Sequence, residues 1–204
     1  MTNKAQDVEV TAVELNPEIA AIYQDFFLND KVIVGDAHQY LLDHYKEFDF
    51  IWSSPPCPTH SRARFWGYSG TKPVYFDMKL YQEIILLKTH YNGKWVVENT
   101  IPYYDPLIPG DIIGRHLFWS NFKIPQITAK DGDIHRGTNN AFQETLGIDI
   151  SKYNIKTDKY SGARARLELL RNCVSPETGL HILNSARNTF PEIQEGLFEK
   201  TEKE

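Results

Sequence analysis

Short apolar runs alternate with amphipathic stretches over residues 8–97 of the chain. The apolar runs, each of strand length, are residues 8–15, 31–34, 48–52 and 95–97. Between them, apolar residues recur at helical spacing over residues 17–27, 38–45 and 76–90. Strands that alternate with helices are typical of a parallel, doubly wound sheet, so the pattern predicts an α/β fold.

Capping residues mark where the predicted elements begin and end. Asn16 can cap a helix that Pro17 opens, with Glu18 in its first turn. Gly35 and Asp36 close the second apolar run, and the Asn–Gly pair at residues 92–93 ends the third amphipathic stretch. These signals predict short connections of the kind found between strands and helices in a doubly wound sheet.

The second half of the chain is less regular. Residues 128–160 are polar and contain the sequence GDIHRGTNNAF, and helical spacing of apolar residues returns over residues 166–183. We therefore expect three parts. They are a catalytic and cofactor-binding α/β domain (1–120), a short irregular target-recognition segment (121–160) and a C-terminal helical segment that returns to the first domain (161–204).

Composition and cysteine usage narrow the class of protein. Hydrophobic residues make up 41% of the chain, yet no apolar run approaches the roughly 18 residues of a membrane span. The N-terminal sequence MTNKAQDVEV lacks the apolar stretch of a signal peptide. Cys57 and Cys173 give neither a CxxC metal pair nor a disulfide framework. These features predict a soluble protein of a reducing cytoplasm.

The formal net charge of −5 does not suit a uniformly basic nucleic-acid binder. A local basic patch is sufficient for binding, however, and Arg62, Arg64 and Lys72 cluster after Cys57. Each of these side chains could equally be an ordinary solvated surface charge.

Reactive side chains occur at or just beyond the ends of the predicted strands. These residues are Glu14, Asp36, Cys57 and Glu98. In a doubly wound sheet the carboxyl ends of the strands meet at one edge, and ligands bind there. The sequence therefore predicts a functional site at that edge.

Cys57 lies in the sequence SPPCP, where a strand gives way to a loop. Pro55 and Pro56 have fixed φ angles and no N–H groups, so they form a rigid frame that can aim the thiol. A reactive cysteine attacks as the thiolate. The ordinary alternative is an inert buried cysteine, and a zinc pair with His60 has no further apparent ligands.

The three carboxylates have functional and ordinary interpretations. Glu98, at a strand end, could have a raised pKa and act as an acid, or could be a capping or solvated glutamate. Glu14 is placed like the acid that binds ribose hydroxyls in nucleotide-binding sheets, or is a surface carboxylate. Asp36 could accept a hydrogen bond from an adenine amino group, or could make a turn.

Six segments form an ordered set. They are AVELNPEIAAIY (12–23), VGDAHQ (34–39), SPPCP (54–58), VVENT (96–100), GRHLFW (114–119) and LLRNCVSPETGLHI (169–182). In this order they resemble the ribose-binding, adenine-binding, catalytic-cysteine, Glu–Asn, arginine-strand and last motifs of the DNA (cytosine-5) methyltransferases. The resemblance is to a short, phage-type group within that family.

The resemblance implies a reaction and a role for each matching residue. Cys57 would attack C6 of a cytosine flipped out of double-stranded DNA, and Glu98 would contact N3 and the amino group. Arg115 would hold the base and the Glu98 carboxylate, and S-adenosylmethionine would supply the methyl group to C5. The residues implied to bind this cofactor are Glu14, Leu15, Asp36, Ala37, Pro56, Val74, Asn172 and Cys173. Arg62, Arg64 and Asn99 are implied to bind DNA, in the cytoplasm of a bacterium or a phage-infected host.

The implied fold is a Rossmann-like, S-adenosylmethionine-dependent methyltransferase sheet, mostly parallel, with a short recognition insertion. Its first strand and Gly-rich turn have no counterpart, because no glycine cluster in the chain follows a buried strand. We consider a late gene start, a split enzyme whose partner chain supplies this strand, and a decayed remnant. A non-catalytic DNA- or partner-binding module is the alternative function, and a small-molecule thiol enzyme explains fewest of the motifs.

Overall fold

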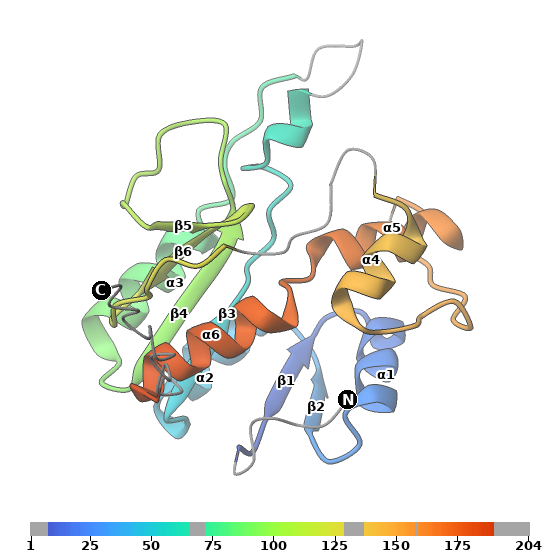
Figure 1. The fold of residues 1–204 in the computed structure, drawn as a ribbon. Helices are drawn as coiled ribbons and strands as arrows, with labels where there is room; N and C mark the ends of the chain where they lie inside the picture. Colours follow the sequence, from blue (N-terminus) through green and yellow to red (C-terminus); the bar gives the residue numbers. More distant parts are fainter. Residues whose placement is uncertain (1–7, 66–71, 129–136, 158, 190–204) are drawn as a thin grey trace, which may run out of the picture.

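The computed structural model describes residues 8–65, 72–128, 137–157 and 159–189 and shows an α/β protein (Figure 1). Its strands are β1 (Thr11–Glu14), β2 (Lys31–Val34), β3 (Phe50–Ser53), β4 (Lys94–Thr100), β5 (Asp111–Ile113) and β6 (His116–Ser120). Strands β1 and β2 pair in parallel as a separate two-stranded sheet. The second sheet has the order β3-β4-β6-β5, in which β3 and β4 are parallel and the other pairs are antiparallel. Parallel pairing is therefore confirmed for β1 with β2 and for β3 with β4, but these pairs lie in two sheets and not in the single sheet that the sequence predicts, and β5 and β6 make the second sheet mixed.

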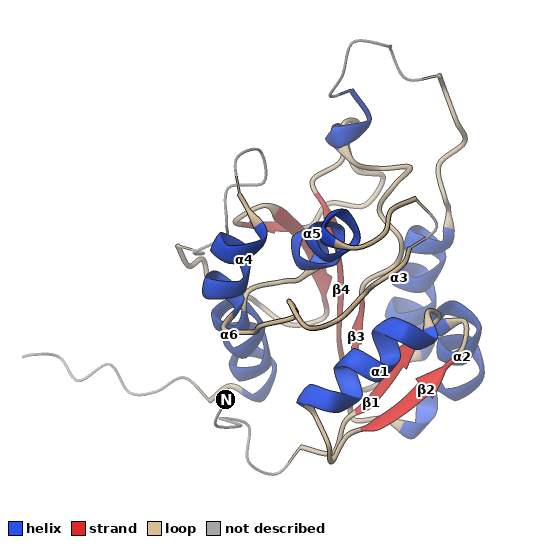
Figure 2. Ribbon diagram, turned by 90° about the vertical axis from the view of Figure 1, so that its right-hand side faces the viewer, coloured by secondary structure: helices blue, strands red, loops and turns tan. Residues whose placement is uncertain are grey.

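Helices connect and cover the strands (Figures 1 and 2). They are α1 (Pro17–Phe26), α2 (Ala37–His44), α3 (Lys79–His90), α4 (Asn139–Leu146), α5 (Ala163–Asn172) and α6 (Pro176–Arg187), with 3-10 turns η1 (Tyr45–Glu47) and η2 (Arg62–Phe65). Within the described residues, no helix is long and apolar enough to cross a lipid bilayer.

Side-chain caps begin the first two helices. The Asn16 side-chain oxygen accepts hydrogen bonds from the backbone N–H groups of Glu18 (2.9 Å) and Ile19 (3.4 Å), and Pro17 occupies the first turn. Asp36 caps α2 in the same way. These bonds satisfy N–H groups that have no partner inside the helix. The predicted Asn16 cap is confirmed.

The region after β6 differs from the expectation in two places. Residues 121–160, expected to be irregular, include α4, which the Thr138 side chain caps and Gly147 ends at φ 66°. The helical spacing over residues 166–183 belongs to two helices, because Ser175 is extended and Pro176 begins α6. A proline cannot continue a preceding helix, since it lacks the N–H group and disfavours helical backbone before it.

The two faces of the mixed sheet are covered by different helices. On one face, Ile84 and Leu87 of α3 pack against Ile51, Trp95 and Val97. On the other face, Ile182 of α6 packs against a cluster that contains Val96 and Phe118. Adjacent residues of β4 point to opposite faces, so this strand is buried on both sides as expected for a strand inside an α/β fold.

A third apolar cluster joins the N-terminal unit to the helices that follow the mixed sheet. Ile22 of α1 packs in it with Phe142 and Leu146 of α4 and with Leu170 of α5. Phe142 and Leu146 lie one helical turn apart, which brings both side chains to the same side of α4. Segments distant in the sequence thereby meet beside α1.

Gly93 offers a test of the close packing between β3 and β4. A Cβ atom at Gly93 would lie 2.8 Å from the carbonyl oxygen of Asp49 and would also collide with the Tyr91 hydroxyl. That hydroxyl donates a hydrogen bond to the carbonyl of Phe48 (2.7 Å), so it cannot move away without losing a partner. We expect Gly93→Ala to lower the free energy of unfolding by about 1–3 kcal/mol, measured by urea denaturation.

Gly179 supplies the matched control. It lies within α6, and nothing occupies the space within 4 Å of a Cβ atom placed there. Gly179→Ala should stabilise the protein by about 0.5–1 kcal/mol, because alanine restricts the unfolded chain more than glycine does. If both substitutions had the same sign, the close approach at Gly93 would not be the cause.

Candidate active site

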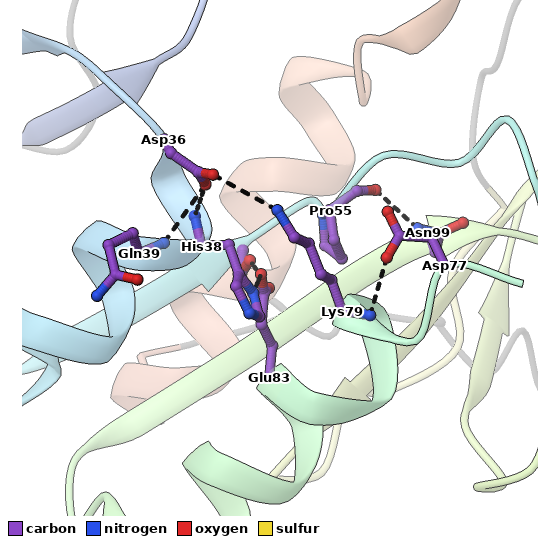
Figure 3. Close-up of polar contacts among 9 residues, drawn as sticks. Asp36, His38, Gln39, Pro55, Asp77, Lys79, Glu83 and Asn99 are labelled. Atoms are coloured by element: carbon purple, nitrogen blue, oxygen red, sulfur yellow. Dashed lines mark hydrogen bonds and ion pairs between the residues drawn. The ribbon is translucent and has the colours of Figure 1, made fainter.

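A buried side chain ties the Cys57 loop to the end of β4. Asn99 is 2% exposed, and its Nδ2 atom donates a hydrogen bond to the carbonyl oxygen of Pro55 at 2.8 Å (Figure 3). Its Oδ1 atom accepts from the backbone N–H of Thr100 (3.0 Å). The expected contact of Asn99 with DNA does not fit this burial, and the structure gives Asn99 a positioning role instead.

Cys57 follows β3 and begins a tight turn. Its carbonyl oxygen accepts hydrogen bonds from the backbone N–H groups of His60 (2.9 Å) and Ser61 (3.0 Å). The side chain is partly buried, and this burial, followed by the nearby charge of Glu98, raises the pKa of the thiol. The resting structure therefore favours the thiol over the thiolate, which is the reactive form.

Glu98 lies in the middle of β4 and is 6% exposed. Burial raises its pKa to about 7, although a hydrogen bond with Ser54 and the positive charge of Arg115 act in the opposite direction. His116, on the adjacent strand β6, places its Nε2 atom 3.7 Å from Glu98 Oε1. A carboxyl group with this pKa can hold or release a proton near neutral pH, which suits an acid catalyst.

Arg115 makes contacts that the sequence does not indicate. Its guanidinium donates hydrogen bonds to the carbonyl oxygens of Arg171 (2.6 Å) and Cys173 (2.9 Å), at the end of α5. It also lies over the ring of Phe142, 5.9 Å from the centroid. Arg115 was expected to hold the Glu98 carboxylate. In this structure it joins the start of β6 to α5, and its charge acts on Glu98 as a smaller effect than burial.

Cys173 belongs to the same region. Burial raises the pKa of its thiol to about 11, and the charges of Arg115 and Glu98 act on it in opposite directions. The thiol donates a hydrogen bond to the carbonyl oxygen of Leu169 (3.4 Å). Asn172, the residue before it, is exposed at the end of α5.

The ends of β1 and β2 carry the other predicted carboxylates. Glu14 is partly buried, and its Oε1 atom accepts from the backbone N–H of Asn16 at 2.8 Å. Asp36 caps α2 through Oδ1, and its Oδ2 atom lies 3.4 Å from Lys79 Nζ (Figure 3). Backbone hydrogen bonds, first from Gln39, lower the pKa of Asp36. Of the two interpretations of Asp36, the structure shows the turn-forming one.

Glu83 is a buried carboxylate that the sequence analysis missed. It lies on α3 at 3% exposure, its Oε1 atom is 2.8 Å from His38 Nδ1, and its Oε2 atom accepts from the Ser53 hydroxyl (Figure 3). A glutamate in an amphipathic helix is normally expected to be exposed to solvent, so the sequence gives no signal that Glu83 is buried and contacts His38 and Ser53. The contacts hold the start of α2 close to the carboxyl end of β3.

His60 is fully buried, and both of its ring nitrogens have protein partners. Nδ1 lies 2.5 Å from the Tyr104 hydroxyl and Nε2 lies 3.0 Å from the carbonyl oxygen of Asp77. Burial lowers the pKa of this imidazole. His60 therefore anchors the Cys57 loop, and the zinc pair considered from the sequence does not fit these contacts.

The remaining predicted site residues lie toward the surface. Pro56, Leu15, Ala37 and Val74 are exposed, Leu15 at 70% and Val74 at 44%. Arg62 is exposed and Arg64 partly buried. Arg62 Nε donates to the carbonyl oxygen of Pro102 (3.1 Å), and an Arg64 guanidinium nitrogen donates to that of Lys72 (3.0 Å). Both arginines thus order the loop that follows Cys57.

The predicted residues consequently form two groups. Cys57, Glu98, Arg115 and Cys173 are close enough for Glu98 or Arg115 to affect the ionisation of the thiols. Glu14 and Asp36 lie at the ends of the other sheet. Comparison with known protein-family models gives no match, and a search of curated protein sequences gives no significant match.

The burial of Glu98 predicts a pH dependence of stability. Because the pKa of Glu98 rises from 4.5 to about 7 on folding, the folded state binds more protons between these values, and stability falls as pH increases through this window. Glu98→Gln keeps the shape of the neutral acid but cannot ionise. Relative to wild type, it should gain up to about 3 kcal/mol between pH 5 and pH 8, measured by urea denaturation.

Glu144→Gln, an exposed glutamate on α4, is the matched control and should show no such gain. His116, which lies 3.7 Å from Glu98, and Arg115, whose charge acts on it, stay unchanged in both variants. An equal stability difference between Glu98→Gln and wild type at the two pH values would contradict the burial effect.

Proposed function

We propose that the chain is a DNA (cytosine-5) methyltransferase, or a subunit of one, that acts on a cytosine flipped out of double-stranded DNA. The observation that carries this proposal is that Glu98, a buried acid of pKa about 7, lies near enough to Cys57 for its charge to raise the pKa of the thiol. The Asn99–Pro55 hydrogen bond links the two segments that hold them. The ordered motifs of the sequence agree with this assignment.

The chemistry needs a nucleophile and an acid at the same base. In the proposed reaction, Cys57 Sγ forms a bond to C6, and the electron pair displaced toward N3 takes the proton of Glu98. C5, now enamine-like, accepts a methyl group, for which S-adenosylmethionine is the donor. The methyl donor leaves as S-adenosylhomocysteine. Water or hydroxide then takes the C5 proton, the C5–H electron pair restores the C5–C6 double bond and expels the Cys57 thiolate, and the proton on N3 returns to the Glu98 carboxylate. A carboxyl group with a pKa of about 7 is protonated often enough at neutral pH to serve as this acid.

Glu98 and Cys57 are also coupled. The negative charge of Glu98 raises the pKa of Cys57, so protonation of Glu98 removes one of the effects that disfavour the thiolate. The reactive state is therefore a Cys57 thiolate beside a neutral Glu98. Binding of a base that hydrogen-bonds to Glu98 favours this state.

The residues at the ends of β1 and β2 fit a nucleoside-containing cofactor in part. Glu14 uses one oxygen to accept from Asn16, and a carboxylate has acceptor capacity for further donors such as ribose hydroxyls. The exposed Leu15 beside it offers apolar surface to an adenine ring. Asp36, in contrast, already uses its carboxylate for the α2 cap and for Lys79.

In this proposal the two sheets are parts of one Rossmann-like methyltransferase sheet whose first strand comes from outside the described residues. The η2 turn, with Arg62 and Arg64, follows Cys57 and would face DNA phosphates near the flipped base. The segment around α4 would contribute to recognition of the target.

A second candidate is a non-catalytic relative that binds DNA or a partner chain. The raised pKa of Cys57 favours it, because burial and the Glu98 charge act against the thiolate that the reaction needs. The separation of β1–β2 from the mixed sheet favours it as well. Covalent trapping distinguishes the two candidates.

Cys57 should form a covalent adduct with duplex DNA in which 5-fluorocytosine replaces cytosine, in the presence of S-adenosylmethionine. Fluorine at C5 cannot leave as the C5 proton does, so the thiol stays attached to C6. After trypsin digestion, mass spectrometry should find the adduct on residues 47–62, which contain Cys57, and not on residues 172–187, which contain Cys173.

Cys57→Ser should give no adduct, and unsubstituted DNA serves as the background control. An equal yield from Cys57→Ser would remove Cys57 as the nucleophile. The absence of any adduct from the wild-type chain would favour the non-catalytic candidate.

Glu14→Ala should weaken the binding of S-adenosylmethionine by about 1–3 kcal/mol, the cost of losing a charge-assisted hydrogen bond to a ribose hydroxyl. Isothermal titration calorimetry measures the change. Glu9→Ala removes an exposed glutamate just before β1 and is the matched control. Equal affinities of the Glu14 and Glu9 variants would refute the ribose-binding role.

A further inference from the structure

Strands β1 and β3 are neighbours in space, yet they are not paired with each other. Figures 1 and 2 both show β1 between β2 and β3. In the described part of the chain, the pairing of β1 is with β2 and that of β3 is with β4, so each of these strands ends its sheet. The molecule thus has two adjacent open sheet edges.

The handedness of the connections explains why these edges face each other. The chain passes from β1 through α1 to β2, then returns through α2 to β3. Crossover connections between parallel strands are right-handed, so a return in the opposite direction places α2 on the opposite face from α1 and β3 on the far side of β1. Contacts of α2 with β1 and with α3 agree with this arrangement. In Figure 1, β1 and β4 point the same way, and β3 is parallel to β4.

The backbone groups at these edges can be assigned from the observed ladders. Lys31 donates its N–H to the carbonyl of Val10 (2.9 Å), and Gly35 donates to that of Glu14 (3.0 Å). Residues of a parallel strand alternate in the neighbour to which they hydrogen-bond, so the N–H and C=O groups of Thr11 and Val13 point away from β2. They point toward β3.

The same alternation applies to β3. Lys94 donates its N–H to the carbonyl of Asp49 (3.1 Å), so Asp49, Ile51 and Ser53 direct their backbone groups toward β4. Phe50 and Trp52 direct theirs toward β1. The edge-facing N–H and C=O groups of β1 and β3 thus point toward each other. A parallel strand placed between them could hydrogen-bond to both.

Burial is incomplete at this place. The inner strands of an α/β fold are normally buried on both faces, as residues 95–99 of β4 are. In β1 all four residues are only partly buried, and in β3 only Ile51 is fully buried. Strands β1 and β3 thus lie between other strands, as central strands do, but their residues are as exposed as those of edge strands.

The ends of the two edges are nevertheless held in place. Glu83 contacts both His38, at the start of α2, and Ser53, at the end of β3. The His38 contact joins the segment that follows β2 to the mixed sheet without a β1–β3 ladder. An incoming strand would therefore meet two edges that are already positioned.

We propose that a partner polypeptide inserts a parallel β-strand between β1 and β3 and joins the two sheets. The strand would have apolar side chains on both faces, because α2 and α3 lie on one side of the sheets and α1 and α6 on the other (Figure 1). It would carry no proline at positions that donate to the neighbouring edges. The inference rests on the backbone geometry and does not depend on methyl transfer.

The six strands of the described residues do not supply this strand, because each is already paired in one of the two sheets. A second copy of the chain would have to release one of its own paired strands. A separate segment that brings an additional strand has neither difficulty.

Amide hydrogen exchange, resolved by residue with NMR, tests whether the edges are open. In the chain alone, the amides of Thr11, Val13, Phe50 and Trp52 should exchange at least about tenfold faster than those of Ala12, Glu14, Ile51 and Ser53. Equal protection of both sets would overturn the proposal, because the edges would then be paired within the chain. Protection of the first set that rises with protein concentration would also overturn it, in favour of self-association.

A display library of random peptides, each about 12 residues long, tests whether a strand can add. Thr11→Pro removes the edge-facing N–H and puts a ring in its place, while Thr11→Val keeps the N–H and the β-branched shape. The selected peptides should be rich in apolar residues, should protect the four edge amides, and should bind Thr11→Pro about tenfold or more weakly than Thr11→Val. Exchange at Ala12 and Ile51 checks that both variants stay folded.

Two outcomes of the selection would refute strand insertion. One is a library that yields no binder to the wild-type chain. The other is a set of binders whose affinities for Thr11→Pro and Thr11→Val are equal, since these peptides would bind elsewhere. Neither readout requires DNA or S-adenosylmethionine, so failure of the methyltransferase proposal and failure of strand insertion remain distinguishable.

Discussion

A hydrogen bond between a buried amide and a proline carbonyl holds the candidate site together. Asn99 Nδ2 donates to Pro55 at 2.8 Å, and this bond joins the end of β4 to the loop that carries Cys57. Pro55 and Pro56 lack N–H groups and cannot donate a backbone hydrogen bond to the sheet. Hydrogen bonds from Arg62 to the Pro102 carbonyl and from the Tyr103 N–H to the His60 carbonyl attach the later part of the loop to the segment after β4. His60 adds an anchor further along through Tyr104 and Asp77. These polar contacts, together with the rigid prolines, position the Cys57 loop.

The electrostatics of the site follow from burial more than from ion pairing. Burial is the largest effect on Glu98, Cys57 and Cys173, and it disfavours the anion of each. The charge of Arg115, whose guanidinium also donates to carbonyl groups at the end of α5, acts against burial at Glu98 and Cys173 but is the smaller effect. Burial therefore favours the protonated forms of both thiols and of the Glu98 carboxyl group. Under the proposed function, the anion of Cys57 would form when a base binds at Glu98.

The outline of the fold could be predicted from the sequence because local signals determine it. The strand β2 comes from a short apolar run, and the start of α1 comes from Asn16 and Pro17, which act within one turn. The cap that Asp36 forms on α2 was not predicted. The site could be predicted less completely. The Glu98 charge acts on the Cys57 thiol because β3, which Cys57 follows, pairs with β4, which carries Glu98 in its interior and not at the strand end that the sequence predicts.

Sequence patterns could not predict contacts between segments that lie far apart in the sequence. From the sequence, Glu83 is expected to be a solvated residue of a helix, but His38 of α2 and Ser53 of β3 contact it in the structure. The resemblance implies that Arg115 contacts the base, and its hydrogen bond to a carbonyl group of α5 could not be predicted. The helix α4 was missed for a related reason. Its polar sequence hides the pair Phe142 and Leu146, whose burial depends on α1 and α5.

Because the strands form two sheets, the candidate site residues are divided between two units that meet at β1 and β3. Glu14 and Asp36 belong to the β1–β2 unit, whereas Cys57 and Glu98 belong to the mixed sheet. Between the units, the Glu83 contacts, the Lys79–Asp36 pair and apolar packing provide the connection, and no ladder of backbone hydrogen bonds joins β1 to β3 in the described chain. The Lys79–Asp36 pair is exposed and contributes little. The distance between Glu14 and Glu98 is thus set by a few side chains. Under the proposed function this is the distance between the cofactor and the base, and a strand bonded to both edges would fix it through the backbone.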